Sequence, residues 1–166
     1  MRWSPAYVAV GSNLNDPRSR VEEAFERLGR LRETRLVVRS PLYRSRPMGP
    51  QDQPDFVNAV AGLVTSLAAR ELLAELQAIE QAMGRVPPAV RWGPRVIDLD
   101  LLVHGSTTST EPGLSLPHPG IHERNFVLYP LAAIAPELHI PGHGRVADLA
   151  RNVGAAGLEQ LSSGVS

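Results

Sequence analysis

The sequence predicts an α+β protein with a ferredoxin-like βαββαβ core and a C-terminal extension that contains a short helix. Strand-like apolar segments and two segments of helical periodicity follow one another in the order β-α-β-β-α-β. The length of 166 residues and the hydrophobic content of 43% are typical of one globular domain. We therefore expect a single domain over residues 1–166, in which a small, polar end from about 154 to 166 frays.

The first helix is expected between two strands. A short apolar run, Ala6–Val10, predicts a buried strand that stops at a tight turn over 11–13, because the glycine spacing of a phosphate loop is missing there. Asp16 and Pro17 then predict a helix start, with the aspartate as N-cap. Apolar residues recur at helical spacing along this helix: Val21, Ala24, Phe25, Leu28 and Leu31. The next strand is predicted over Thr34–Arg44.

The second half of the core repeats the pattern. A long proline-rich loop, 45–54, precedes a strand over Phe56–Thr65, and loops of that length inside compact domains are usually functional. A helix is expected over about Ala68–Met83, ended by Gly84. After a second loop, 84–94, comes a strand over Val96–Val103, and beyond it a short helix within Glu123–Ile134.

Composition excludes several classes of chemistry. All 17 basic residues are arginine, which excludes mechanisms built on a lysine, whether or not codon usage is the cause. The absence of cysteine excludes thiolate metal sites and cysteine nucleophiles. Zero net charge argues against nucleic-acid binding, and the missing apolar run of about 18 residues argues against a membrane span. A cytoplasmic protein without a signal peptide is expected, using carboxylates, histidines, arginines and a metal.

Two carboxylates lie in the last predicted core strand. Strand alternation sends Asp98 and Asp100 to one face, about 7 Å apart, and their apolar neighbours Ile97, Leu99, Leu101 and Val103 to the other. Paired carboxylates in an apolar strand need a compensating positive charge, which Mg²⁺ supplies when it shares phosphate ligands. The alternative is an edge strand whose aspartates are solvated or paired with arginines.

Flanking residues favour a nucleotide site over that alternative. Arg91, Trp92 and Arg95 stand directly before the strand, where guanidinium groups bind phosphoryl oxygens and an indole stacks on a heterocycle. Phe56 and Phe126 could hold a flat bicyclic ligand whose edge an amide such as Asn58 reads, although core packing would also explain both rings.

A zinc pair is disfavoured at His118 and His122. Pro117 and Pro119 make a helix there unfavourable, and no third ligand is near in the sequence. A phosphate contact by His118 and a purely structural role both remain open.

Together these segments resemble the 6-hydroxymethyl-7,8-dihydropterin pyrophosphokinase family. The matching stretches are 10–14 (VGSNL), 49–58 (GPQDQPDFVN), 84–86 (GRV), 91–100 (RWGPRVIDLD) and 116–118 (LPH), and the resemblance covers about residues 6–152. It implies transfer of the β,γ-pyrophosphoryl group of ATP to the hydroxymethyl group of the pterin, which gives the pterin diphosphate and AMP in folate biosynthesis. It also implies a ferredoxin-like fold.

The resemblance assigns roles to individual residues. Asp98 and Asp100 would hold two Mg²⁺ ions and, with Arg85 and Arg95, form the catalytic group. The pterin would be bound by a second set: Ser45, Met48, Phe56, Asn58, Trp92 and Phe126. The nucleotide would contact a third: Gln77, Glu80, Arg85, Arg91, Trp92, Arg95, Leu101, Leu114, Ser115, His118 and Arg124. ATP and the pterin would be the only partners of an expected monomer.

The chain departs from the family pattern at a few positions. Pro87 and Pro88 stand where members often have basic residues in a mobile loop, Pro119 replaces a frequent tyrosine, and Phe56 replaces another. The segment 111–113 lacks a frequent arginine. Two other hypotheses stay open: a nucleotidyltransferase, since Gly11-Ser12 and a D-x-D pair occur there, and a pterin- or nucleotide-binding domain without activity.

Overall fold

The computed structural model describes residues 2–47, 53–85 and 95–162. Its main sheet is antiparallel, with strand order β10-β3-β4-β1-β5, and β2 also pairs with β4. The strands are β1 (Ser4–Ser12), β2 (Thr34–Arg39), β3 (Tyr43–Ser45), β4 (Phe56–Thr65), β5 (Asp98–His104) and β10 (Leu158–Gln160). The order of β5, β1, β4 and β2 is that of the predicted ferredoxin-like core, which is confirmed.

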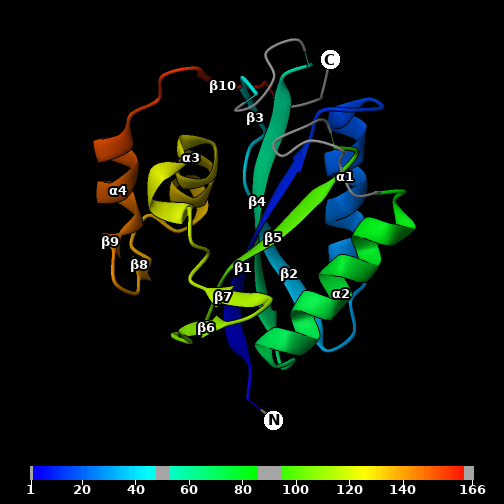
Figure 1. Ribbon diagram of the computed structural model, residues 1–166, viewed down its shortest axis with the longest axis vertical. Helices are drawn as coiled ribbons and strands as arrows, with labels where there is room; N and C mark the ends of the chain where they lie inside the picture. The colour runs from blue at the N-terminus through cyan, green and yellow to red at the C-terminus, as the bar shows by residue number, and fades with distance from the viewer. Residues whose placement is uncertain (1, 48–52, 86–94, 163–166) are drawn as a thin grey trace.

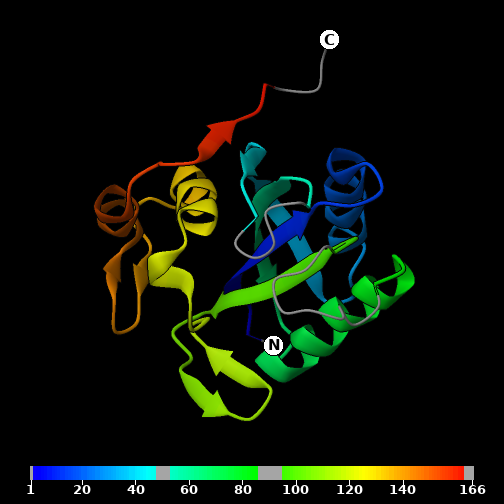
Figure 2. The same cartoon turned by 45° about the horizontal axis from the view of Figure 1, so that its top comes forward.

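Helices cover both faces of this sheet (Figures 1 and 2). On one face lie α1 (Pro17–Leu28) and α2 (Ala69–Ala82), and on the other lie α3 (Asn125–Ile134) and α4 (Val146–Val153). Side chains of β1 point alternately into two hydrophobic cores. Val8 and Val10 pack with α1 and α2, whereas Tyr7 and Ala9 pack with α3 and α4. The central strands are therefore buried on both sides, whereas β2 is largely exposed.

β5 lies at the edge of the sheet beside β1 and contains an irregularity. Val8 pairs with Leu101 and Tyr7 with Val103, so Leu102 is an extra residue, a β-bulge. Val103 therefore lies opposite Tyr7, which packs on the α3 side, and does not continue the face of Leu99 and Leu101 as alternation had predicted.

Several predicted boundaries change. The strand expected over Thr34–Arg44 is two strands, β2 and β3, because Pro41 has no amide hydrogen for a ladder and Ser40 turns its hydroxyl to the amide of Val60 at 2.8 Å. The first strand continues to Ser12, so Gly11 and Ser12 belong to a strand and not to a tight turn.

The start of α1 and the C-terminal end bring further corrections. Asp16 precedes α1, but its side chain makes no cap bond to the helix and accepts instead from the Ser19 hydroxyl at 2.7 Å. The tail does not fray throughout, since Leu158–Gln160 forms β10. The short helix within Glu123–Ile134 is confirmed as α3.

Further elements were not predicted. They are β6 (Ser109–Glu111), β7 (Leu114–Leu116), η1 (Ile121–Glu123), β8 (His139–Ile140), β9 (Gly144–Arg145) and α4. Over the part of the chain that is described, every helix is too short or too polar to cross a lipid bilayer.

Candidate active site

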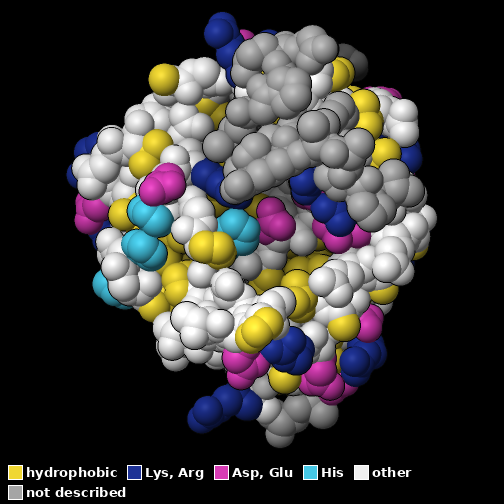
Figure 3. All heavy atoms as spheres, in the orientation of Figure 1, with side chains coloured by type: hydrophobic (Ala, Val, Ile, Leu, Met, Phe, Trp, Pro, Cys, Tyr) yellow, Lys and Arg dark blue, Asp and Glu magenta, His cyan; other side chains and the backbone are white. Residues whose placement is uncertain are grey.

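A cavity of about 270 Å³ opens at one end of the sheet, on the face that carries α3. Figure 3, drawn in the orientation of Figure 1, shows acidic, arginine and histidine side chains gathered near the middle of the visible surface, between the α3 and α4 side and the α1 and α2 side. The cavity is lined from β1, β3, β4, β5, the start of α3 and the segments that adjoin them by the following residues: Ala9, Val10, Gly11, Ser45, Arg46, Phe56, Asn58, Ala59, Arg95, Asp98, Asp100, His118, Arg124, Phe126 and Val127. Predicted metal, acceptor and nucleotide residues therefore share one cavity.

The strand register explains how the two ends of the cavity are spaced. Gly11 of β1 pairs with Asn58 of β4 on one side and with Asp98 of β5 on the other. Neighbouring strands lie about 4.8 Å apart, so Asn58 and Asp98 stand about 10 Å apart across the glycine. A Cβ at position 11 would lie 3.3 Å from the Asn58 amide oxygen, so the missing side chain keeps this space open.

Two arginines approach Asp98. Arg95 donates to both of its carboxylate oxygens, at 3.0 and 3.2 Å, and Arg85 Nε lies 3.2 Å from Oδ1 in ion-pair contact. Burial nevertheless raises the pKa of Asp98, and the charge of Asp100 raises it further, while the arginines oppose the shift. Burial also raises the pKa of Asp100 against the charges of Arg124, Arg95 and Arg85. The local arginines thus leave the pair short of positive charge.

That shortage is what a bound cation would correct. Within residues 2–47, 53–85 and 95–162, no three acidic or histidine side chains converge as ligands for a metal. Asp98 and Asp100 alone would leave most of a metal shell to phosphate and water oxygens, which is the way Mg²⁺ is usually held beside nucleotides. The donor set therefore fits a nucleotide-dependent magnesium site.

Glu80 supports this end of the cavity from behind β5. It is 8% exposed, accepts the amide of Leu99 at 2.7 Å and lies 3.8 Å from Arg85. Desolvation raises its pKa to about 7, although the Leu99 hydrogen bond and Arg85 lower it. Glu80 therefore holds Arg85 and the strand between the aspartates in one arrangement.

Arg95 itself is anchored to the end of β1. Asn13 is 1% exposed; its main-chain amide donates to the Arg95 carbonyl at 3.0 Å, and its side-chain oxygen accepts from the Arg95 main-chain amide at 2.8 Å. Its side chain also donates to Gln53 Oε1 and to the carbonyl of Pro54, both at 2.9 Å. Sequence reasoning did not identify this anchor, although a buried strand that ends in polar residues is the signal that could have found it.

The acceptor end combines aromatic rings with a fixed amide. Asn58 donates to the Ser45 hydroxyl at 2.7 Å, and both side chains are buried. Because the amide nitrogen is used in this bond, the amide oxygen is left to accept from a ligand. Phe56 and Phe126 line the same cavity from β4 and α3.

His118 is held as a neutral side chain. Its main-chain amide donates to Leu102 at 2.9 Å, and its Nδ1 accepts from the Gly120 amide at 3.2 Å. Burial, helped by the charge of Arg124, lowers the pKa of His118 to about 4. With Nδ1 as acceptor, Nε2 carries the proton and can donate one hydrogen bond.

The predicted site residues do not all meet in the cavity. Leu101 and Leu114 are buried in the core with α1 and α2, so a nucleotide could reach only their main chains. Gln77 and Ser115 are exposed and do not line the cavity. Met48, Arg91 and Trp92 lie outside the described residues, as do Pro87 and Pro88. The cavity residues that were not predicted are Ala9, Val10, Gly11, Arg46, Ala59 and Val127.

Comparison with known proteins gives consistent matches. Residues 7–136 match the family described as 7,8-dihydro-6-hydroxymethylpterin-pyrophosphokinase (HPPK). The chain is 50% identical over 155 residues to 2-amino-4-hydroxy-6-hydroxymethyldihydropteridine pyrophosphokinase of Pseudomonas aeruginosa, covering 93% of this chain and 95% of that one. It is 44% identical over 146 residues to the enzyme of the same name from Haemophilus influenzae, covering 88% and 91%.

A solved structure supports the fold. The HPPK-DHPS structure of Plasmodium falciparum with pteroate superposes with a TM-score of 0.72 at 13% identity. The match covers 91% of this chain and 42% of that chain, so the present chain spans less than half of that protein. At this identity the likeness carries the arrangement of helices and strands alone.

Proposed function

The chain belongs to the 7,8-dihydro-6-hydroxymethylpterin-pyrophosphokinase family, and we propose that the cavity beside Asp98 and Asp100 is its active site. The reaction of the family is transfer of a pyrophosphoryl group from ATP to the hydroxymethyl group of the pterin, in folate biosynthesis. The presence of the aspartates and of Asn58 in one cavity carries the proposal. The end of the cavity at Asp98 and Asp100, proposed for the phosphates, is therefore adjacent to the end at Asn58, proposed for the acceptor.

In this proposal, Asp98 and Asp100 would hold two Mg²⁺ ions beside the phosphates of ATP. Their raised pKa values support it, because a neighbouring cation would stabilise both charged carboxylates. Bound Mg²⁺ would neutralise phosphate oxygens and the charge that develops between them during transfer. The protein would supply the fixed positions.

The arginines orient the phosphates. Arg95 and Arg85 both contact Asp98 and can each bind a phosphoryl oxygen. Arg124 and neutral His118 also line the cavity, where His118 Nε2 can donate without competing as a base. The fixed guanidinium charges would stabilise the transition state, since positioning and neutralisation dominate phosphoryl transfer.

The pterin occupies the acceptor end. The free amide oxygen of Asn58 accepts from an N–H of the pterin edge, and Phe56 and Phe126 contact the ring faces. Contacts by Met48, Arg91 and Trp92 remain part of the proposal. A monomer is proposed as well, to be checked by the mass of the purified protein in solution.

The products of ATP test the reaction at this site. With the hydroxymethyl dihydropterin and MgATP, AMP is expected in a 1:1 ratio to pterin diphosphate, and Asp98→Ala should suppress both. Accumulation of ADP would overturn the proposal. Release of inorganic pyrophosphate would favour the nucleotidyltransferase alternative, and calorimetric binding without turnover at any Mg²⁺ concentration would favour a binding domain.

A further inference from the structure

The C-terminal segment 154–162, which we call the strap, runs from the end of α4 past the start of α3 to the edge of the sheet (Figures 1 and 2). There, β10 pairs with β3 in the register Leu158 to Ser45 and Gln160 to Tyr43. The amide of Leu161 continues the ladder by donating to the Leu42 carbonyl at 2.8 Å. β3 would otherwise be an edge strand on this side, and it carries the cavity residue Ser45.

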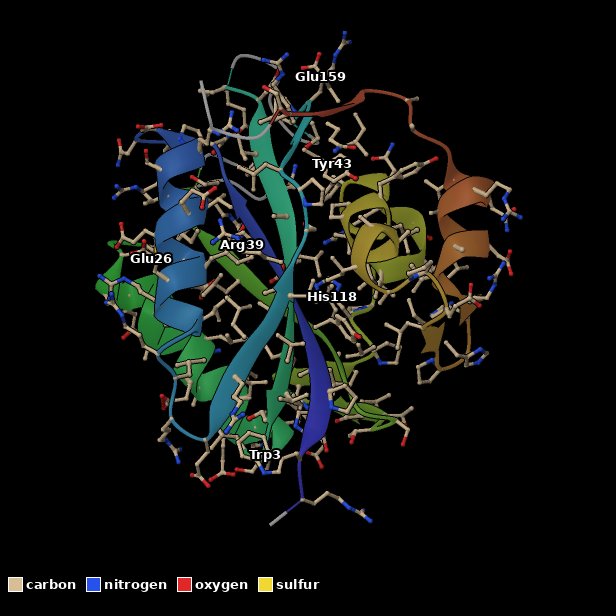
Figure 4. The ribbon with its side chains drawn as sticks, turned by 180° about the vertical axis from the view of Figure 1, so that it is seen from behind. Trp3, Glu26, Arg39, Tyr43, His118 and Glu159 are labelled. Atoms are coloured by element: carbon tan, nitrogen blue, oxygen red, sulfur yellow. The ribbon has the colours of Figure 1, made fainter. Side chains whose placement is uncertain are left out.

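An ion pair marks the same edge. Arg44 of β3 contacts Glu159 of β10, and Figure 4 shows Glu159 and the neighbouring Tyr43 at the upper end of the sheet. Both side chains are half-exposed, so this ion pair contributes little to the free energy of unfolding. Its position is consistent with the register of β10 against β3. The main-chain ladder is the stronger connection.

A second connection joins the strap to α3 through Asn125. The side-chain amide of Asn125 donates to the carbonyl of Gly154 at 3.0 Å and to that of Ala156 at 2.9 Å. Two carbonyl acceptors can be satisfied together only by an NH₂ group, which fixes the orientation of this amide. Asn125 is the first residue of α3 and stands between Arg124 and Phe126, both of which line the cavity.

The strap therefore connects two walls of the cavity that are far apart in sequence. One wall contains Ser45, which orients Asn58, and the other contains Phe126. The main chain between Ala156 and Leu158 is short, so a shift of α3 would be transmitted to β3. A planar ligand held between ring and amide is sensitive to such shifts, since small misplacements reduce binding and rate.

We propose that Asn125 is a positioning residue for the pterin, acting through the strap to set the separation between the Phe126 and Ser45 walls. This inference rests on the pterin site of the proposed function. It predicts that the hydrogen-bond donors of Asn125 matter more than its volume. Asn125→Gln retains both donors on a longer arm, Asn125→Ala removes them, and Asn125→Asp places an anion against two carbonyl oxygens.

Steady-state kinetics at saturating MgATP provide the test. The KM for the hydroxymethyl dihydropterin should rise in the order wild type, Gln, Ala, Asp, reaching about tenfold for Asn125→Ala, while kcat changes less than KM. Hydrogen exchange should become faster at the amide of Leu161 in the Ala variant. Thr65→Val is the matched control, since it removes buried hydroxyl bonds to Thr34, Glu33 and Leu67 at the other end of β4.

The outcomes distinguish a failure of the strap proposal from a failure of the proposed pterin site. If Phe126→Ala raises the pterin KM but Asn125→Ala behaves like Thr65→Val, the strap proposal is wrong and the pterin site stands. If Phe126→Ala also leaves the KM unchanged, both are overturned. A KM that rises equally in the Ala and Thr65→Val variants would show a loss of stability alone and would contradict positioning.

Discussion

Glu80→Gln offers a direct measurement of how strongly the sheet desolvates the acidic end of the cavity. Burial raises the pKa of Glu80 from an ordinary value of 4.5 to about 7, with Asp98 and Asp100 contributing, while the Leu99 amide and Arg85 act against the shift. Folded Glu80 therefore keeps its proton at pH values where the unfolded chain has lost it. Because the folded state binds more protons over this interval, stability must fall as pH rises from about 4.5 to 7.

The size of the effect follows from the two pKa values. Their difference corresponds to roughly 3 kcal/mol, fully lost above the folded pKa. Glutamine retains an acceptor for the Leu99 amide and does not ionise. The free energy of unfolding of the wild type should thus fall relative to Glu80→Gln by about that amount between pH 4 and 8. Asp98 and Asp100 titrate in both proteins, so the difference reports the ionisation of Glu80 together with its coupling to these two carboxylates.

Urea unfolding at several pH values, with chelator and without nucleotide, gives the two free energies. A difference between the proteins that stays constant within about 0.5 kcal/mol from pH 4 to 8 would refute the reasoning. It would mean that Glu80 is already ionised in the folded state, as an ion pair with Arg85 strong enough to offset burial would require.

Three other predictions address the site and the sheet. Asp98→Ala should lower the rate of AMP formation at least roughly 10²-fold with an unchanged circular dichroism spectrum; near-normal rates would contradict the metal assignment. Gly120→Ala would place a Cβ 2.7 Å from Arg124 Nε, so we expect the flexible arginine to move, the KM for ATP to rise severalfold and stability to stay within about 0.5 kcal/mol. An unchanged KM would show that Arg124 does not depend on this space. Gly62→Ala brings a Cβ to 2.7 Å from a methyl group of Val38 inside the sheet and should cost about 1–3 kcal/mol in urea unfolding, with kcat retained; a loss of kcat in folded protein would contradict the separation of the two regions.

Sequence patterns predicted elements most reliably where the hydrophobic periodicity and the residues that end an element indicate the same boundary. The strand Phe56–Thr65 was predicted with both of its ends, because proline precedes it and helix-forming residues follow. The break at Ser40 and Pro41 was missed, because strand-forming residues lie on both sides of it, at 36–38 and at 42–43, while the backbone turns between them. α4 was missed because its eight residues follow closely on glycines that indicated a loop.

In the candidate site, too, some residues could be predicted from a local pattern and others could not. Alternation alone places Asp98 and Asp100 on one face of β5, and the structure has them there. The role of Asn13 depends on Arg95, 82 residues away, and no local pattern contains such a contact. Glu80 follows the apolar stripe of α2, but its burial depends on β5 lying across it. Contacts between distant segments are what the sequence leaves undetermined.

Because of the bulge at Leu102, the effect of deleting one residue from β5 depends on where in the strand the residue is deleted. Deletion of Leu102 would leave Val103 and Leu101 as successive partners of Tyr7 and Val8, a regular ladder, and both aspartates would keep their face. The cost would be a buried leucine, about 2–5 kcal/mol. Deletion of Leu99 would instead turn an aspartate into the core against α2. Length differences among relatives should therefore be aligned at position 102 or beyond it, and not between Asp98 and Leu101.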